Sequence, residues 1–130
     1  MSGGAREFHP EDVLVSAVVG AAYEVSNVLG AGFLEKVYQR ALLIELMSRG
    51  IKATTEVALP VHYKGQLVGS YSPDLLVDDR LLVELKCVDH FAAEHLAQCL
   101  NYLKAAGLPI ALLINFQRPK VEWKRIILTQ

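Results

Sequence analysis

Two carboxylates and a lysine stand on neighbouring apolar segments near the middle of the chain. Asp74 precedes the apolar run 75–77, and Glu84 and Lys86 follow directly on the run 81–83. Buried strands exclude charged side chains unless these are paired or bind a ligand. Two carboxylates make a hard oxygen site for Mg²⁺ or Mn²⁺, and an ammonium beside them can stabilise developing negative charge. These three residues are therefore the first candidates for chemistry.

The spacing of these residues predicts a hairpin that brings them together. If residues 78–80 form the turn, Val77 pairs with Leu81 and Asp74 lies opposite Glu84, with their Cβ atoms about 5 Å apart. Lys86 then points to the same face, whereas a two-residue turn at 79–80 would move Asp74 to the other face. Pro73 has no N–H to donate, which predicts a bend or bulge just before Asp74.

The elements that must position this hairpin follow from apolar periodicity. We predict three helices, at about 10–29, 32–49 and 92–106. We predict strands at 56–63, 67–71, around Asp74, around Glu84, at 110–114 and at 123–128. The expected core faces are Leu14, Ala17, Val18, Ala21, Val25 and Val28 on the first helix, and Leu34, Val37, Ala41 and Ile44 on the second. This order predicts an α/β fold with three α/β/α layers around a mixed sheet.

Composition limits the class of protein. With 130 residues the chain is long enough for one domain, which we place at 11–130 after a flexible N-terminal tail at 1–10. No apolar run reaches the roughly 18 residues that a membrane span requires, so we expect no membrane association. Two cysteines provide neither a disulfide framework nor zinc spacing, which favours the cytoplasm. The net charge of −1 argues against a tight non-specific nucleic-acid binder but leaves a nuclease open.

Three segments in this order resemble one known superfamily over roughly residues 13–127. Pro73-Asp74 with Glu84-Leu85-Lys86 looks like the PD-(D/E)XK nucleases. The segment 32–38, with Gly32, Glu35 and Tyr38, is similar to the motif that names the GxxExxY family within them. The segment 98–102, with Gln98 and Tyr102, resembles the QxxxY motif of the RecB-like exonucleases. Ser72 departs from the pattern, because a basic residue is expected there.

The resemblance implies a restriction-endonuclease-like αβββαβ core and a set of roles. Asp74, Glu84 and the backbone carbonyl of Leu85 would bind the metal, with Glu35 as a third carboxylate. Lys86 would position or activate the attacking water and stabilise the charge of the transition state. Gln98 would contact substrate or water, and its neighbour Tyr102, four residues on, shares its helix face.

The residues themselves leave alternatives open. Glu35 could simply be an exposed acid that suits the start of a helix. Tyr38 could orient Glu35, stack on a base or belong to the core, and Gln98 with Tyr102 could be an ordinary helix-surface pair. Glu56 is a further acid that nothing in the sequence places at the site.

The leading hypothesis is a Mg²⁺- or Mn²⁺-dependent nuclease that acts on DNA in preference to RNA. The alternative is a domain of the same fold that only binds nucleic acid or a protein. A domain this small has little room for its own DNA clamp, so a homodimer or another protein partner is a third hypothesis.

Overall fold

The computed structural model describes residues 9–129, and residues 1–8 of the expected tail lie outside that range. Its centre is a five-stranded sheet in the order β1-β4-β5-β6-β7. The strands are β1 (Ala53–Thr54), β4 (Leu75–Val77), β5 (Leu81–Lys86), β6 (Ile110–Asn115) and β7 (Glu122–Ile127). β5 and β6 run parallel and the other neighbours antiparallel, so the sheet is mixed as predicted.

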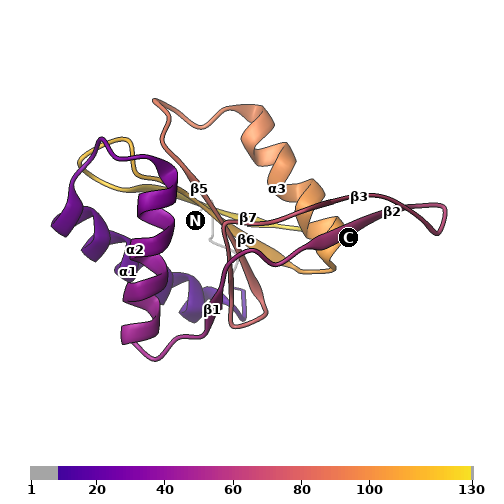
Figure 1. Ribbon diagram of the computed structural model, residues 1–130, viewed down its shortest axis with the longest axis horizontal. Coiled ribbons are helices and arrows are strands. Elements are labelled where there is room, and N and C mark those ends of the chain that lie inside the picture. Colours follow the sequence, from indigo (N-terminus) through magenta and orange to yellow (C-terminus); the bar gives the residue numbers. More distant parts are fainter. Residues whose placement is uncertain (1–8, 130) are drawn as a thin grey trace, which may run out of the picture.

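Helices cover both faces of this sheet, which confirms the three-layer prediction (Figure 1). On one face, α1 (Asp12–Leu29) and α2 (Glu35–Ser48) enclose the larger core, which includes Leu81, Val83 and Leu85 of β5. On the other face, α3 (Ala93–Ala106) packs with Leu82 in a smaller core. β6 is buried along its whole length because it lies between the two layers.

The crossover between the parallel strands β5 and β6 is made by α3, as parallel strands require. α3 ends at Gly107, whose left-handed backbone (φ 69°) is the conformation that glycine adopts most readily. Cys99 lies on the buried face of α3, as expected for a small core residue.

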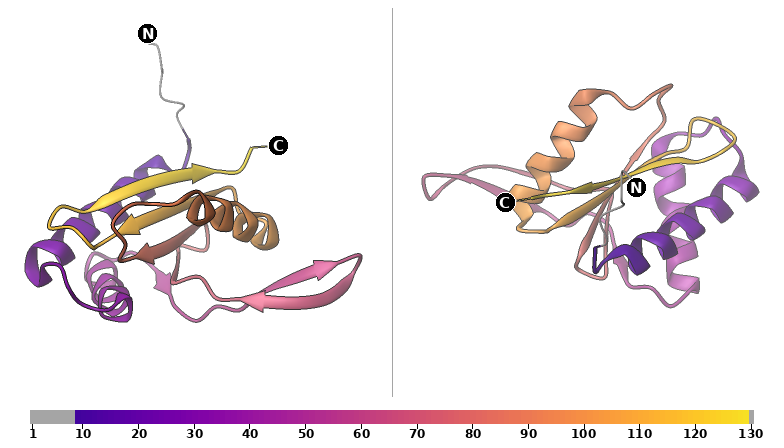
Figure 2. Two further views of the ribbon diagram at one scale, coloured as in Figure 1. Left: turned by 90° about the horizontal axis from the view of Figure 1, so that it is seen from above. Right: turned by 180° about the vertical axis from the view of Figure 1, so that it is seen from behind.

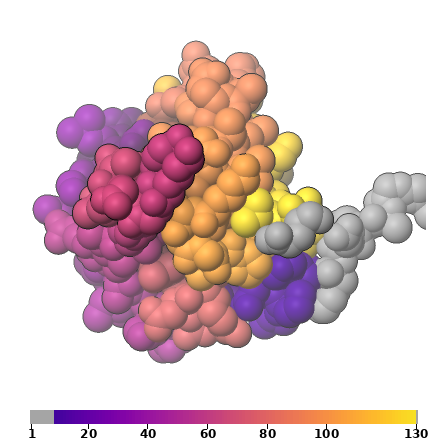
Figure 3. All heavy atoms as spheres, turned by 90° about the vertical axis from the view of Figure 1, so that its right-hand side faces the viewer, coloured from indigo at the N-terminus to yellow at the C-terminus, as the bar shows by residue number. Residues whose placement is uncertain are grey.

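Two predicted strands do not join the sheet. β2 (Leu59–Tyr63) and β3 (Gln66–Tyr71) pair only with each other, and we call the segment 59–71 the arm. The arm projects from the domain beside α3 (Figure 2), and its free side is seen in front of the domain in Figure 3. β2 also starts later than predicted, because Glu56 has a left-handed backbone (φ 61°) that interrupts an extended strand.

The predicted core face of α2 is wrong. Leu34 and Ile44 are 79% and 68% exposed, whereas Tyr38, Leu42 and Leu46 are fully buried. The helix carries two apolar stripes, and the stripe that contains Tyr38 packs against the sheet. On α1 most of the predicted stripe packs inward, but Val28 at its end is 71% exposed.

By length and composition, α1 is apolar enough to cross a membrane, and it is the one such helix in residues 9–129. Its buried side chains, including Val18, Ala21 and Ala22, pack in the larger core. A helix of a protein core meets the same criteria, so this observation gives α1 no second role.

Candidate active site

The hairpin that carries the acidic residues has the predicted register. Val77 pairs with Leu81 and Leu75 with Val83, so Asp74 precedes the last pair at a position opposite Glu84. Asp74 lies in the bend that Pro73 predicted, one residue before β4. The three-residue turn therefore places the two carboxylates opposite each other on neighbouring strands.

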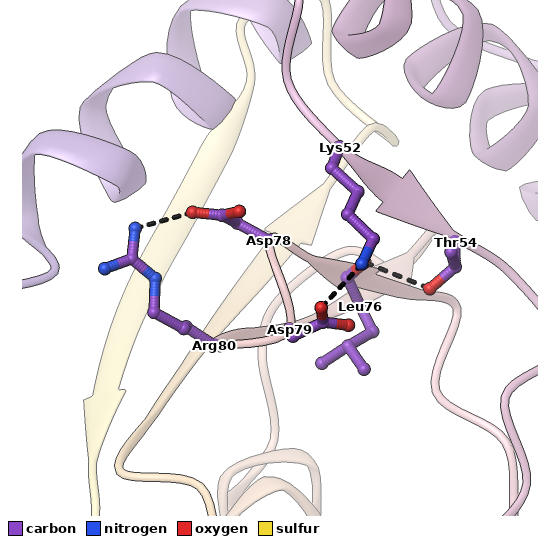
Figure 4. A network of polar contacts seen from close by, with 6 residues as sticks. All are labelled: Lys52, Thr54, Leu76, Asp78, Asp79 and Arg80. Carbon is purple, nitrogen blue, oxygen red and sulfur yellow. Dashed lines mark hydrogen bonds and ion pairs between the residues drawn. The ribbon is translucent and has the colours of Figure 1, made fainter.

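The turn is held by ion pairs on its outer side (Figure 4). Asp78 and Asp79 both have left-handed backbones (φ 53° and 56°), which aspartate tolerates better than most residues. Asp79 accepts a 2.7 Å bond from Lys52, and Asp78 one of 2.6 Å from Arg80. Because these pairs are exposed, we assign them the task of fixing the turn rather than a large share of the stability.

The alternation of β5 assigns the acidic group to the α3 face. Leu81, Val83 and Leu85 point to the α1–α2 core and Leu82 to the α3 core. Glu84 and Lys86 therefore share the face of Leu82. The site lies at the end of β5 and is approached from α3 on one side and from the start of α2 on the other.

Hydrogen bonds fix the two carboxylates against the backbone. The Asp74 N–H donates to Glu84 Oε2 at 2.9 Å, and the Leu85 N–H donates to Asp74 Oδ2 at 2.7 Å. Gln39 of α2, which is nearly buried, donates from Nε2 to the Asp74 carbonyl at 2.8 Å. Each carboxylate thus has one oxygen, Glu84 Oε2 and Asp74 Oδ2, held in place by a backbone N–H.

Electrostatics set these acids apart from ordinary surface carboxylates. Burial, followed by the charge of Asp74, raises the pKa of Glu84 from 4.5 to about 7. Burial is also the main reason that the pKa of Asp74 is raised, and the charge of Lys86 opposes the shift in both carboxyl groups. Two buried carboxylates close together are unfavourable when both are ionised, and a bound cation would relieve this repulsion.

The donor set fits a hard divalent cation in part. Two carboxylates and nearby backbone carbonyls are oxygen ligands, which Mg²⁺ and Mn²⁺ prefer. Within residues 9–129, however, no three His, Cys, Asp or Glu side chains lie together at metal-binding spacing. The fit therefore rests on the pair Asp74–Glu84 completed by backbone and water.

Glu35 reaches this end of the sheet without joining the pair. It is the first residue of α2, and its Oε2 accepts a 3.2 Å bond from the Cys87 N–H just beyond β5. Its charge still raises the pKa of both Asp74 and Glu84. Glu35 is thus a neighbour of the acidic pair, and its role as a third ligand stays a prediction.

Tyr38 lies in the core rather than on the surface. It is fully buried, its ring stacks on Phe116 at 4.5 Å, and its hydroxyl donates to the Gly30 carbonyl at 2.6 Å and accepts from the Phe33 N–H at 3.2 Å. The expectation that it stacks on a base is wrong, because no face of the ring is exposed. Its contacts instead fix the loop that leads to Glu35.

We expect Tyr38→Phe to destabilise the protein by about 1–3 kcal/mol, because the Phe33 N–H and the Gly30 carbonyl lose their partner. Chemical denaturation measures this change, and Tyr23→Phe on α1 is the matched control. A variant as stable as the wild type would show that the loop does not depend on this hydroxyl.

The face of α3 that carries Gln98 and Tyr102 looks toward the site. The Tyr102 ring stacks on Tyr71 at the base of the arm, with centroids 3.6 Å apart, and Gln98 lies within hydrogen-bonding reach of its hydroxyl. Burial first and the charge of Glu84 second raise the pKa of both tyrosines. The structure therefore brings Tyr102 near Glu84, with Gln98 beside Tyr102.

Sequence reasoning missed two residues at this site and could not place a third. Gln39 could have been found, because it lies one turn after Glu35 on the same helix. Tyr71 gave no signal, since tertiary packing brings it in, and Glu56 was a further acid that the sequence did not place. Glu56 lines an open pocket of about 320 Å³ with Lys36, Ser72 and Asp74. Lys36 lowers the pKa of Asp74 and places a cation beside Ser72, where the family pattern has a basic residue.

Comparison with known families agrees with this geometry. The chain matches the PD-(D/E)XK nuclease superfamily over residues 12–126. The chain belongs to this superfamily. Among curated proteins, none matches it significantly.

Solved structures with a similar fold include an alkaline exonuclease. LHK-Exo in complex with dAMP has 16% sequence identity and a TM-score of 0.51, over 88% of this chain and 80% of that chain. The alkaline exonuclease LHK-Exo from Laribacter hongkongensis has 15% identity and a TM-score of 0.50, over 91% and 82%. The protein SSO0001 has 11% identity and a TM-score of 0.50, over 91% and 79%. These likenesses establish that the chain shares its fold with these proteins.

Proposed function

We propose that the protein is a nuclease that uses Mg²⁺ or Mn²⁺ to hydrolyse the phosphodiester bonds of DNA. The observation that carries this proposal is the pair Asp74–Glu84, held by backbone hydrogen bonds with both carboxyl pKa values raised. Membership of a nuclease superfamily supports the reaction class. The preference for DNA is an inference, which the dAMP bound to LHK-Exo makes reasonable.

The roles of the acidic residues follow from where they lie. Asp74, Glu84 and the Leu85 carbonyl would hold the cation, and the charge of Glu35 lies close enough to add to its attraction. A divalent cation supplies Lewis acidity and a bound water of lowered pKa. The N–H groups of Asp74 and Leu85 keep the two carboxylates pointed at one place.

In this proposal Lys86 stabilises the charge on the scissile phosphate. It shares the face of Glu84, and its charge already lowers the pKa of both carboxyl groups. An ammonium so placed stabilises the negative charge that builds up on the phosphate oxygens. Gln98 and Tyr102 would contact the substrate from α3, and Lys36 would contact a phosphate from α2.

We also propose the GxxExxY branch, on the motif residues Gly32, Glu35 and Tyr38. Gly32 has a left-handed backbone (φ 107°) in the loop before α2, so another residue would be strained there. Glu35 reaches the site and Tyr38 fixes that same loop. A cytoplasmic location is part of the proposal, and free Cys87 and Cys99 are consistent with it.

A module that binds nucleic acid without cutting it is the second candidate. The lack of a three-ligand cluster in the described residues favours it. The complete set Asp74, Glu84 and Lys86 favours the enzyme.

Calorimetric titration with Mn²⁺ separates these candidates. We expect the wild type to bind and Asp74→Ala to lose at least about tenfold in affinity, because a carboxylate ligand is removed. Asp89→Ala, an exposed aspartate after β5, should bind like the wild type. A wild type that binds DNA but takes up no Mn²⁺ would be a binding module.

A further inference from the structure

The outer stripe of α2 is apolar, and three of its four side chains are exposed. Leu34, Val37 and Ile44 are 79%, 38% and 68% exposed, and Ala41 lies between them. Leu34 is the N-cap residue just before α2, and Val37, Ala41 and Ile44 follow on the helix at spacings of four and three residues, which is the a and d pattern of a helix that packs on another helix. Exposed apolar surface of this regularity marks an interaction site more often than chance.

The stripe continues into a groove between α2 and the end of α1. This groove of about 180 Å³ is lined by Val28, Leu29, Ala41 and Ile44, with Glu24 and Glu45 at its rim. Val28 is 71% exposed. An apolar floor with an acidic rim fits an apolar side chain flanked by a cation.

Charged residues flank the stripe on both sides. If Leu34 and Ala41 are a positions, and Val37 and Ile44 d positions, then Arg40 is a g position and Glu45 an e position. In two parallel helices the g residue of one meets the e residue that follows five positions later in the other. Arg40 and Glu45 have this spacing and opposite charges, so the surface is complementary to a second copy of itself.

The ion pairs within the chain leave this contact available. Among residues 9–129, Arg40 has no ion-pair partner. Glu45 uses Oε2 for Arg49 at 2.7 Å, which leaves Oε1 for a cation from outside. DNA is a poor occupant because the stripe itself carries no charge.

We propose that the protein forms a homodimer in which α2 packs parallel to α2 of a second copy about a two-fold axis. Leu34, Val37, Ala41 and Ile44 form the seam, and Arg40 of each copy pairs with the partner's Glu45. Val28 and the groove enlarge the contact, which a 14-residue helix alone would not stabilise. Because the helices are parallel, the Glu35 ends of both copies, and with them both acidic sites, face the same end of the dimer.

The test is the mass of the full chain in solution, which does not depend on metal binding or on nuclease activity. Sedimentation equilibrium from 1 to 200 µM should give twice the monomer mass for the wild type. Ile44→Glu should weaken dimerisation by at least about 30-fold, since it places a charge in the seam. The exposed Leu67→Glu on the arm, at a similar exposure of 66%, should dimerise like the wild type.

A charge exchange tests the geometry. Arg40→Glu should weaken the dimer, and adding Glu45→Lys to it should restore the dimer. Exchanging the two charges restores the attraction only if residue 40 of one copy contacts residue 45 of the other. Circular dichroism checks that each variant is folded. A wild type that is monomeric at 200 µM would overturn the proposal, as would an Ile44→Glu variant that stays dimeric. An unrestored double variant would overturn the parallel arrangement.

Discussion

Replacement of Lys86 by alanine is expected to lower turnover on DNA by about 10²- to 10³-fold with Mg²⁺ or Mn²⁺ present, the range for removing one donor to transition-state charge. Lys86 shares the sheet face of Glu84 but is not among the proposed oxygen ligands. The substitution should therefore leave the affinity for Mn²⁺ nearly unchanged. Loss of an interaction made mainly in the transition state lowers kcat rather than binding.

Single-turnover cleavage and Mn²⁺ calorimetry on the same preparation measure the two effects separately. Lys120→Ala, an exposed lysine before β7, is the matched control and should cleave like the wild type. Unchanged turnover in Lys86→Ala would remove this lysine from the mechanism. Joint loss of turnover and metal binding would make it a structural partner of the acids.

Glu84→Gln is expected to stabilise the metal-free protein above neutral pH. The folded-state pKa of Glu84 is raised from 4.5 to about 7, so the folded protein holds a proton that the unfolded chain has released between these values. Stability consequently falls as the pH rises from about 4.5 to 7, and the cost is fully present above 7. A rise of this size corresponds to roughly 3 kcal/mol, and glutamine avoids it while its carbonyl can still accept from the Asp74 N–H.

Denaturation at pH 4 and pH 8, with metal removed, tests this sign. The gain from Glu84→Gln should be near zero at pH 4 and about 1–3 kcal/mol at pH 8. Glu94→Gln, at an exposed position on α3, is the matched control. Added Mn²⁺ should stabilise the wild type and not Glu84→Gln, because only a state that binds the ion gains from it. A variant that is less stable at pH 8 would make Glu84 a structural acid.

The hairpin of Asp74 and Glu84 was predictable because its information is local. The turn residues, the period of two and the position of Pro73 all act within about a dozen residues. The register follows from them without reference to the rest of the fold. The alternation of β5 then assigned Lys86 to the same face.

The packing of α2 was not predictable in the same way. Its sequence offers one stripe through Leu34 and Ile44 and another through Tyr38 and Leu46, and periodicity alone cannot choose between them. The choice depends on the sheet surface, which Phe116 helps to form by stacking on Tyr38. For the same reason the place of Tyr71 beside Tyr102 had no local signal, since it depends on contact between the arm and α3.

The arm gives the acidic site a thermodynamic link to local opening. Most of its residues are exposed, and only its base, with Leu59 and Tyr71, joins the α3 core. A unit with so few buried contacts separates from the domain at a lower free energy than the sheet unfolds. Tyr71 lies near enough for the charge of Glu84 to raise its pKa, and detachment of the arm would expose that side of Glu84 to water. A Glu84 side chain that gains water on opening would have a lower pKa, so ionisation of Glu84 and opening of the arm are expected to favour each other.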